Sequence, residues 1–279
     1  MSTFVEIAPD EYDPTAFKGF RPSAAGFEMA NARALMWFSQ LAYETHRTPT
    51  IEAVSGVWEF TSVVSFIKHK TSLKGSFETC GLIGERAGAV IMAFAGTDPG
   101  IWQNLATDFT PLPQAGSDIH EGFRLAAAAA QSEIEQAVRL SRQSQKPLFI
   151  IGHSLGAALA ALAAQVALEK GLSPSAVYTF GMRRVGGERS EASYDAGLGV
   201  LTYRLVHGID LVARATIVRR VSPCWPRASM QRRSEIRQGE AAVADQVRRS
   251  AIRQAAPQHV PLSGKLKAAK SAGETIGKL

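Results

Sequence analysis

Three absences limit what this chain of 279 residues can be. Its two cysteines, Cys80 and Cys224, are too few for the disulfide framework of a small secreted domain, so we expect reduced thiols and a cytoplasmic location. The first residues, MSTFVEIAPDEYDP, carry four acids and neither a basic segment nor an apolar core. We therefore expect no signal peptide, and export by another route stays open. No apolar run reaches the length of a membrane span.

Acidic and aromatic side chains are scarce in the last part of the chain. Residues 1–214 hold 18 lysines and arginines against 21 aspartates and glutamates, whereas residues 215–279 hold 13 against 4 and a single aromatic, Trp225. Such a segment buries little apolar surface, so we expect residues 215–279 to be a disordered basic tail. A basic tail would suit nucleic acid or an anionic membrane. Because the body carries no nucleic-acid motif, we expect no nucleic-acid partner and at most transient contact with a membrane surface.

The chain is rich instead in alternating strand and helix patterns. Apolar residues recur at helical spacing in Asn31–Thr45, and β-branched and aromatic residues dominate Val57–Phe66. The turn GERAG joins two strand patterns into a hairpin, the second of them the apolar run AVIMAF. This alternation predicts an α/β fold with a mostly parallel sheet covered by helices on both faces, in a domain of residues 31–214 after an N-terminal extension of residues 1–30. Further helices are expected at Glu121–Arg142, Leu155–Lys170 and Glu188–Ala196, and further strands at PLFIIG, SAVYTFG and VLTYRLVH.

One stretch, IIGHSLGAALAALAA, places a serine between two glycines where a strand pattern becomes a helix pattern. In a G-x-S-x-G turn the serine, here Ser154, sits on a sharp and strained bend that exposes its hydroxyl above the sheet. Gly152 and Gly156 allow close backbone approach because they have no β-carbon. The N–H of Leu155 at the helix N-terminus would favour an oxyanion. The sequence therefore predicts a nucleophilic serine, and a plain glycine-rich helix start is the alternative.

The chain resembles the class 3, fungal-type lipases of the α/β-hydrolase fold over roughly residues 31–214. The resemblance rests on seven segments in family order: NARALMWFSQLAYE, IMAFAGTD, NLATDF, IHEGF, IIGHSLGAALAALAA, VYTFGMRRVGG and YRLVHGIDLVAR. The resemblance implies a serine hydrolase, that is, a lipase or esterase that cleaves carboxylic esters of lipids through an acyl-enzyme intermediate. It implies a Ser–Asp–His triad and no cofactor or metal ion. It leaves the oligomeric state open.

The family motifs imply roles for individual residues of this chain. Ser154 matches the nucleophile, and Asp210 in VHGIDLVAR matches the triad acid, which fixes the tautomer of the base. Thr97 in AFAGTD matches the oxyanion position, where its N–H would act with that of Leu155. Asp108 in NLATDF is a competing acid, but it precedes the serine, so we interpret it as a structural hydrogen-bonding residue.

The base histidine is the weakest element of the predicted triad. Only His259 follows Asp210, and its context, APQHVPL, differs from that of the family base, so a solvated tail histidine is the alternative. His153 adjoins the nucleophile and is expected to have a structural hydrogen-bonding role. The remaining histidines all precede Asp210 and are not expected to be the base: His46, His69, His120 and His207.

Because the base histidine is weakly assigned, two other functions remain as alternatives. The chain could be a catalytically impaired lipase-like scaffold that binds acyl chains, or an acyltransferase that uses the same serine and oxyanion hole. Ile101 and Trp102, in PGIWQNL just after the oxyanion segment, are candidates for a lid or an acyl contact, and equally for the core. Substrate chain length and head group are not readable from the sequence.

The sequence of the tail also indicates a reading-frame shift. Class 3 lipases normally continue with a P-P pair and then an aromatic-R-H-V-G-R segment. When RATIVRRVSPCWPRASM is back-translated and read one base downstream, suitable synonymous codons give VPPSFGVFRHVGRVLQC. Two of these residues, the second glycine and the cysteine, are forced by the genetic code. We therefore predict a frame shift near Ala215, with a divergent native tail that supplies His259 as the competing interpretation.

Overall fold

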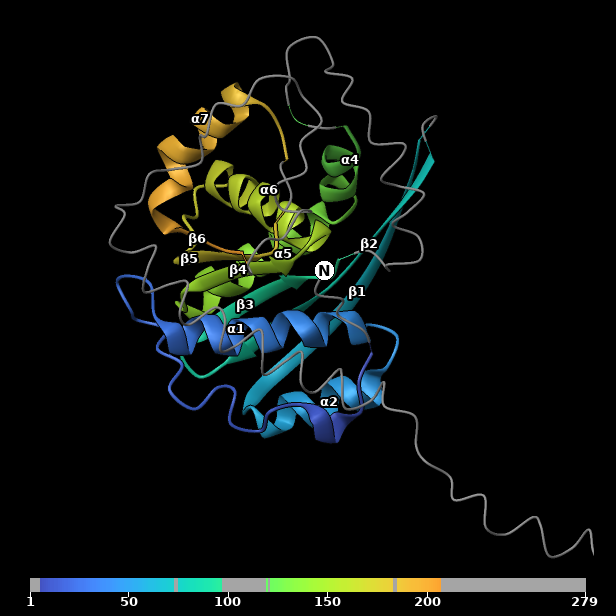
Figure 1. The fold of residues 1–279 in the computed structure, drawn as a ribbon, viewed down its shortest axis with the longest axis vertical. Helices are drawn as coiled ribbons and strands as arrows, with labels where there is room; N and C mark the ends of the chain where they lie inside the picture. Colours follow the sequence, from blue (N-terminus) through green and yellow to red (C-terminus); the bar gives the residue numbers. More distant parts are fainter. Residues whose placement is uncertain (1–5, 73–74, 97–118, 120, 183–184, 207–279) are drawn as a thin grey trace, which may run out of the picture. The chain divides into compact units, whose positions relative to one another are not determined.

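Six strands form one sheet in the order β1-β2-β3-β4-β5-β6 (Figure 1). The computed structural model describes residues 6–72, 75–96, 119, 121–182 and 185–206. The β1–β2 and β2–β3 pairs are antiparallel and the other three pairs are parallel, so β2 alone runs against the other five strands. The predicted α/β class with a mostly parallel sheet is confirmed. The strands are β1 (Phe60–Ser72), β2 (Gly75–Arg86), β3 (Ala89–Phe94), β4 (Leu148–His153), β5 (Ala176–Phe180) and β6 (Thr202–Leu205).

The centre of the sheet is buried on both faces. Every residue of β3, β4 and β5 is buried, which explains their continuous apolar sequences. The predicted hairpin is present, with Arg86 paired to Ala89 and Gly88 in the turn at a φ of 82°. The parallel register pairs Phe94 with Gly152, so β3 and β4 end at the same edge of the sheet. That edge is where the G-x-S-x-G turn lies.

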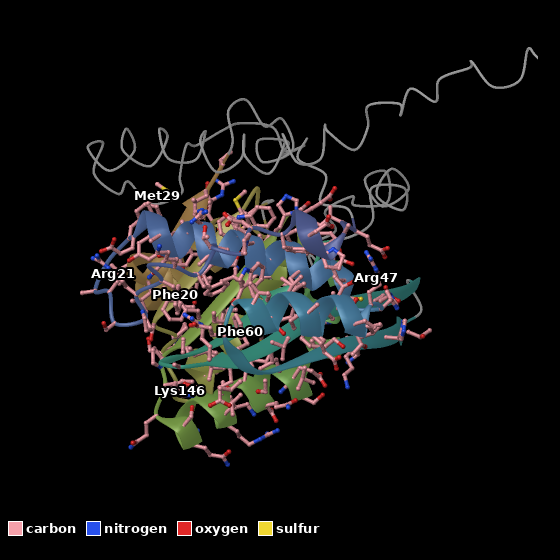
Figure 2. The ribbon with its side chains drawn as sticks, turned by 90° about the horizontal axis from the view of Figure 1, so that it is seen from below. Phe20, Arg21, Met29, Arg47, Phe60 and Lys146 are labelled. Carbon is pink, nitrogen blue, oxygen red and sulfur yellow. The ribbon has the colours of Figure 1, made fainter. Side chains whose placement is uncertain are left out.

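One face of the sheet is covered by α1 (Met29–Leu41), the short helix η2 (Ala42–Glu44) and α2 (Thr48–Val57). Figure 2 shows Met29 and Arg47 at the two ends of the α1–η2 segment. Large aromatic rings fill this face, and the described part of the predicted N-terminal extension contributes several of them, after the short helix η1 (Pro9–Glu11). Because apolar rings bury large areas, this N-terminal segment adds substantially to the core.

The other face is covered by α4 (Glu121–Ala129), α5 (Gln131–Ser144) and α6 (Leu155–Glu169) (Figure 1). α6 packs on β3, β4 and β5, and most of its buried residues are alanines. α7 (Glu188–Leu198) packs against α6, and the short helix η3 (Gly199–Leu201) leads into β6. The expected helices on both faces are therefore present.

The prediction of a single helix over Glu121–Arg142 is wrong, because this segment forms two helices, α4 and α5, that are separated at Ala130. The Thr79 hydroxyl of β2 donates to the Ala126 carbonyl at 2.9 Å. That carbonyl would accept the Ala130 N–H in a continuous α-helix. The Ala130 N–H bonds the Ala127 carbonyl instead, at 3.1 Å. A contact from a distant strand thus ends α4, although every residue at the break is a good helix former.

The strand expected over Val57–Phe66 begins late, because α2 continues to Val57 and β1 starts at Phe60. Trp58 is 1% exposed, and its indole N–H donates to the Asp13 carbonyl at 2.8 Å. Glu59 then reverses the chain with a φ of 61°. Val57 and Trp58 were predicted to belong to the strand because of their β propensity. Tertiary packing overrides that propensity in the folded protein.

The Cys80 thiol forms no disulfide. Among the helices of the described ranges, none combines the length and apolar composition that a bilayer crossing requires. Cys224 and the predicted tail lie outside the described residues. The predicted domain boundaries stay predictions.

Candidate active site

Ser154 occupies a sharp turn between β4 and α6. Its φ of 56° and ψ of −118° place it in a region that non-glycine residues rarely adopt, as the G-x-S-x-G pattern predicts. Two backbone hydrogen bonds hold the turn: the Ser154 N–H donates to the Phe180 carbonyl at 2.9 Å, and the Ala157 N–H donates to the Ser154 carbonyl at 3.2 Å. The strained residue is therefore fixed by β5 on one side and by α6 on the other.

The two glycines of the motif allow backbone to lie against backbone. A β-carbon on Gly152 would lie 2.1 Å from the Gly156 carbonyl oxygen, and one on Gly156 would lie 2.2 Å from the Phe94 carbonyl oxygen. Neither contact is possible for a real side chain. The start of α6 consequently packs directly on the end of β3, which sets the height of Ser154 above the sheet.

The start of α6 provides a positive end close to Ser154. Ser154 is half-buried, and its hydroxyl makes no capping hydrogen bond to the helix. The first N–H groups of a helix have no intrahelical partner and carry the positive end of the dipole. The first turn of α6 contains no acidic side chain. Leu155 is the first residue of α6, so its N–H belongs to this positive end, and its role as an oxyanion donor stays a prediction.

The chain leaving β3 passes directly beside this turn. A β-carbon built on Gly96 would lie 3.4 Å from the Ser154 β-carbon and 3.0 Å from the His153 carbonyl oxygen. The same β-carbon would lie 2.3 Å from the Tyr43 hydroxyl oxygen. Gly96 is thus enclosed by the serine turn and by Tyr43. Thr97 follows it in the sequence but lies outside the described residues.

His153 is part of the structural support of the turn. It is 5% exposed, and burial lowers its pKa from 6.5 to about 3, so its imidazole is neutral at ordinary pH. Its Nδ1 atom lies 2.9 Å from the Tyr43 hydroxyl. The predicted structural hydrogen-bonding role is confirmed. His46 and His69 are exposed, as expected of surface residues.

The remaining predicted site residues lie outside the described residues, so their roles stay predictions. The described part of the site brings together Ser154, Leu155, His153 and Gly96 at the ends of β3 and β4. Outside it lie Thr97, Ile101, Trp102, Asp108, His120, His207, Asp210 and His259.

Tyr43 was not among the predicted site residues. It belongs to NARALMWFSQLAYE, a segment with a helical pattern that also contributes to the family resemblance, and nothing in that segment singles out the tyrosine. Tyr43 and His153 are 110 residues apart, so no local pattern connects them. The pairing becomes visible only when η2 and the end of β4 are placed side by side.

The part of the chain that contains this turn matches a known protein family. The family model described as lipase (class 3) matches residues 91–219, which include most of β3, the serine turn and β6. This part of the chain is therefore similar to the class 3 lipases.

A curated protein and solved structures are also similar to this chain. Lipase ZK262.3 of Caenorhabditis elegans is 27% identical over 209 residues, covering 71% of this chain and 58% of that protein. The chain therefore spans less than two thirds of the length of this curated relative. The Rhizomucor miehei lipase in its propeptide complex has a TM-score of 0.52 at 20% identity, over 74% of this chain and 76% of that one.

A third relative is a solved triacylglycerol lipase whose catalytic centre is described as a serine protease triad. It is 19% identical, with a TM-score of 0.52 over 66% of this chain and 73% of that one. At such identities the two solved structures show the fold alone, which is that of the fungal lipases, the α/β-hydrolase fold.

Proposed function

We propose that this protein is a class 3 lipase, a serine hydrolase that cleaves carboxylic esters of lipids. The observation that carries the proposal is the strained Ser154 turn, held between β5 and α6 with its hydroxyl uncommitted to helix capping. Such strain is retained where the surrounding structure supports it, and it is concentrated at functional sites. The likeness to a triacylglycerol lipase with a serine triad supports the same chemistry.

In the proposed reaction the Ser154 oxygen attacks the ester carbonyl while a histidine removes the hydroxyl proton. The N–H groups of Leu155 and Thr97 stabilise the oxyanion of the tetrahedral intermediate. The intermediate collapses as the histidine returns the proton to the leaving alkoxide, which leaves an acyl-serine. Water, deprotonated by the same histidine, then releases the carboxylic acid. Asp210 orients the histidine, and in the chain as written His259 is the candidate base.

The substrate class is proposed as lipid or acyl esters, without a cofactor. A screen over p-nitrophenyl esters of increasing acyl length would measure the length that the site accepts. Activity confined to short soluble esters would indicate an esterase and overturn the lipid assignment.

Replacing Ser154 with alanine is the direct test of the nucleophile. We expect Ser154→Ala to abolish ester hydrolysis and labelling by a fluorophosphonate, with a loss in turnover of about 10⁶-fold where the full triad operates. The fold should persist, because alanine is smaller and the hydroxyl caps nothing. Ser55→Ala on α2, whose hydroxyl bonds the Glu52 carbonyl at 3.4 Å, is a matched control that should retain activity. Activity of Ser154→Ala within tenfold of the wild type would show that another group is the nucleophile.

We also propose that the sequence after about Ala215 results from a reading-frame shift. Charge balance and aromatic content both change near residue 214, and the shifted reading yields a family-like segment. The chain as written should therefore be weakly active, whereas the chain with its frame restored should hydrolyse esters at least about 10³-fold faster if a missing triad member is regained. Both chains should be assayed, each with and without Ser154→Ala. Equal activity in the two frames would refute the shift and favour His259 as base.

A further inference from the structure

The Tyr43 hydroxyl joins two segments that border the nucleophile. It lies 2.9 Å from Nδ1 of His153, the residue before Ser154. It also lies against Gly96, the residue before the predicted oxyanion residue Thr97, since a β-carbon at Gly96 would approach it to 2.3 Å. One oxygen atom thus contacts the ends of both β3 and β4.

Both side chains that meet at this contact are neutral. Burial keeps the His153 imidazole neutral and raises the pKa of the Tyr43 phenol, so the phenol keeps its proton. A backbone hydrogen bond with Gly96 opposes that rise, which identifies the Gly96 N–H as the donor. The Tyr43 oxygen therefore accepts from Gly96 and lies within hydrogen-bond distance of Nδ1 of the neutral His153 ring.

The position of Tyr43 is itself held firmly. It lies in η2, beside Glu44, whose side chain is fully buried. The Glu44 carboxylate accepts hydrogen bonds from the Ile7 N–H at 2.9 Å, the Tyr12 hydroxyl at 3.0 Å and the Arg47 guanidinium at 2.9 Å. These bonds tie the η2 corner to the N-terminal segment, so Tyr43 is attached to a rigid support.

We propose that Tyr43 is a positioning residue whose hydroxyl holds Gly96, and so the entry to the oxyanion segment, against the Ser154 turn. This inference rests on the proposed ester hydrolysis for its catalytic consequence. The N–H of Thr97 must lie near 3 Å from the developing oxyanion to stabilise it, and it follows Gly96 directly in the chain. A fixed Gly96 therefore limits the positions that this donor can adopt.

Removing the Tyr43 hydroxyl should weaken stabilisation of the transition state more than it weakens substrate binding. Tyr43→Phe keeps the ring and loses both hydrogen bonds. A displacement of about 1 Å in a catalytic group costs on the order of 10²-fold in rate, so we expect kcat to fall about 10- to 100-fold. KM should change by less than about threefold, because the ground-state carbonyl gains little from the oxyanion hole.

The matched control is Tyr194→Phe in α7, which removes another buried tyrosine hydroxyl, bonded to the Thr202 hydroxyl at 2.8 Å. Both variants lose a buried hydroxyl, so their thermal stabilities should fall by similar amounts, and only Tyr43→Phe should lower kcat. Amide hydrogen exchange supplies a second measurement that needs no activity. The Gly96 N–H should exchange at least tenfold faster in Tyr43→Phe and at the wild-type rate in Tyr194→Phe.

The possible outcomes separate the inference from the proposed function. Unchanged exchange at Gly96 in Tyr43→Phe overturns the inference, whatever the activity. Faster exchange with unaltered kcat shows a purely structural contact and also overturns it, as does an equal kcat loss in Tyr194→Phe. Faster exchange together with the selective loss in kcat supports it. A wild-type chain without esterase activity in either reading frame counts against the proposed function, and Gly96 exchange then decides whether Tyr43 holds this segment.

Discussion

The two faces of the sheet are filled by opposite kinds of side chain. Under α6 the buried residues are mostly alanine, and the helix backbone approaches the strands so closely that Gly156 touches the Phe94 carbonyl. Under α1 the space is filled by aromatic rings. Phe17 lies within 5.1 to 6.4 Å, between ring centroids, of Phe20, Phe38, Trp58 and Phe60.

The difference in side-chain size between the two faces has a structural reason. The α6 face positions a reactive serine, so the helix start must approach the strand ends closely, and only small residues permit that. The α1 face holds larger side chains, which include the buried Phe17 and Phe20 of the N-terminal segment. We therefore expect added atoms to be the most damaging on the α6 face and removed atoms the most damaging on the α1 face.

The largest effect is expected from an added methyl group at the start of α6. Gly156→Ala places a β-carbon 2.2 to 2.7 Å from backbone atoms of Phe94 and Ala95, which cannot move aside like a side chain. We expect the free energy of unfolding to fall by about 4 kcal/mol, beyond the usual range for overpacking, measured by urea denaturation. Gly56→Ala in α2 meets no atom within 4 Å and should be neutral or stabilising by up to about 1 kcal/mol. Equal losses in both variants would contradict the proposed close approach.

A removed ring on the α1 face should cost nearly as much. Phe17 is 5% exposed, and the Arg86 guanidinium lies 5.0 Å from its ring centroid. Phe17→Ala should lower the free energy of unfolding by about 3 to 4 kcal/mol through the cavity and the lost cation–π contact. Phe17→Leu, which refills part of the volume, should cost about half as much by the same denaturation measurement. A loss under 1 kcal/mol for Phe17→Ala would mean that the N-terminal segment contributes little to this core.

The smallest expected effect is a pH dependence at the buried His153 of the α1 face. The folded-state pKa of His153, about 3, lies below its unfolded value of 6.5. The unfolded chain therefore binds a proton first, and stability is full above pH 6.5 and declines as pH falls towards 3. Between pH 7 and pH 5 this histidine should remove about 2 kcal/mol of unfolding free energy.

The measurement is urea denaturation at both pH values, with His153→Asn compared against the wild type. The variant should show a pH-dependent loss smaller by about 2 kcal/mol. The exposed His69→Asn change should keep the wild-type loss. A His153→Asn variant with the wild-type pH dependence would assign the loss to other groups.

Most of the fold could be predicted because its elements have strong local patterns. The buried runs AVIMAF, PLFIIG and SAVYTFG are short and bounded by turn residues, and each forms a parallel strand. The pattern failed where a distant contact changed a boundary. The Thr79 hydroxyl ends α4 inside a helix-forming sequence, and the burial of Trp58 extends α2 into a segment with strand propensity.

The sequence by itself determined the serine turn, because strand, G-x-S-x-G and helix are consecutive and their geometry is set within a few residues. Gly152 and Gly156 are required there by the backbone contacts that the turn creates. Only the tertiary structure decided what surrounds that turn. Tyr43, Gly96 and His153 come from η2, the end of β3 and the end of β4, and their contacts arise because the parallel register brings both strand ends to one edge below η2. Hydrogen bonds between such distant residues leave no periodicity in the chain, since they depend on packing rather than on local spacing.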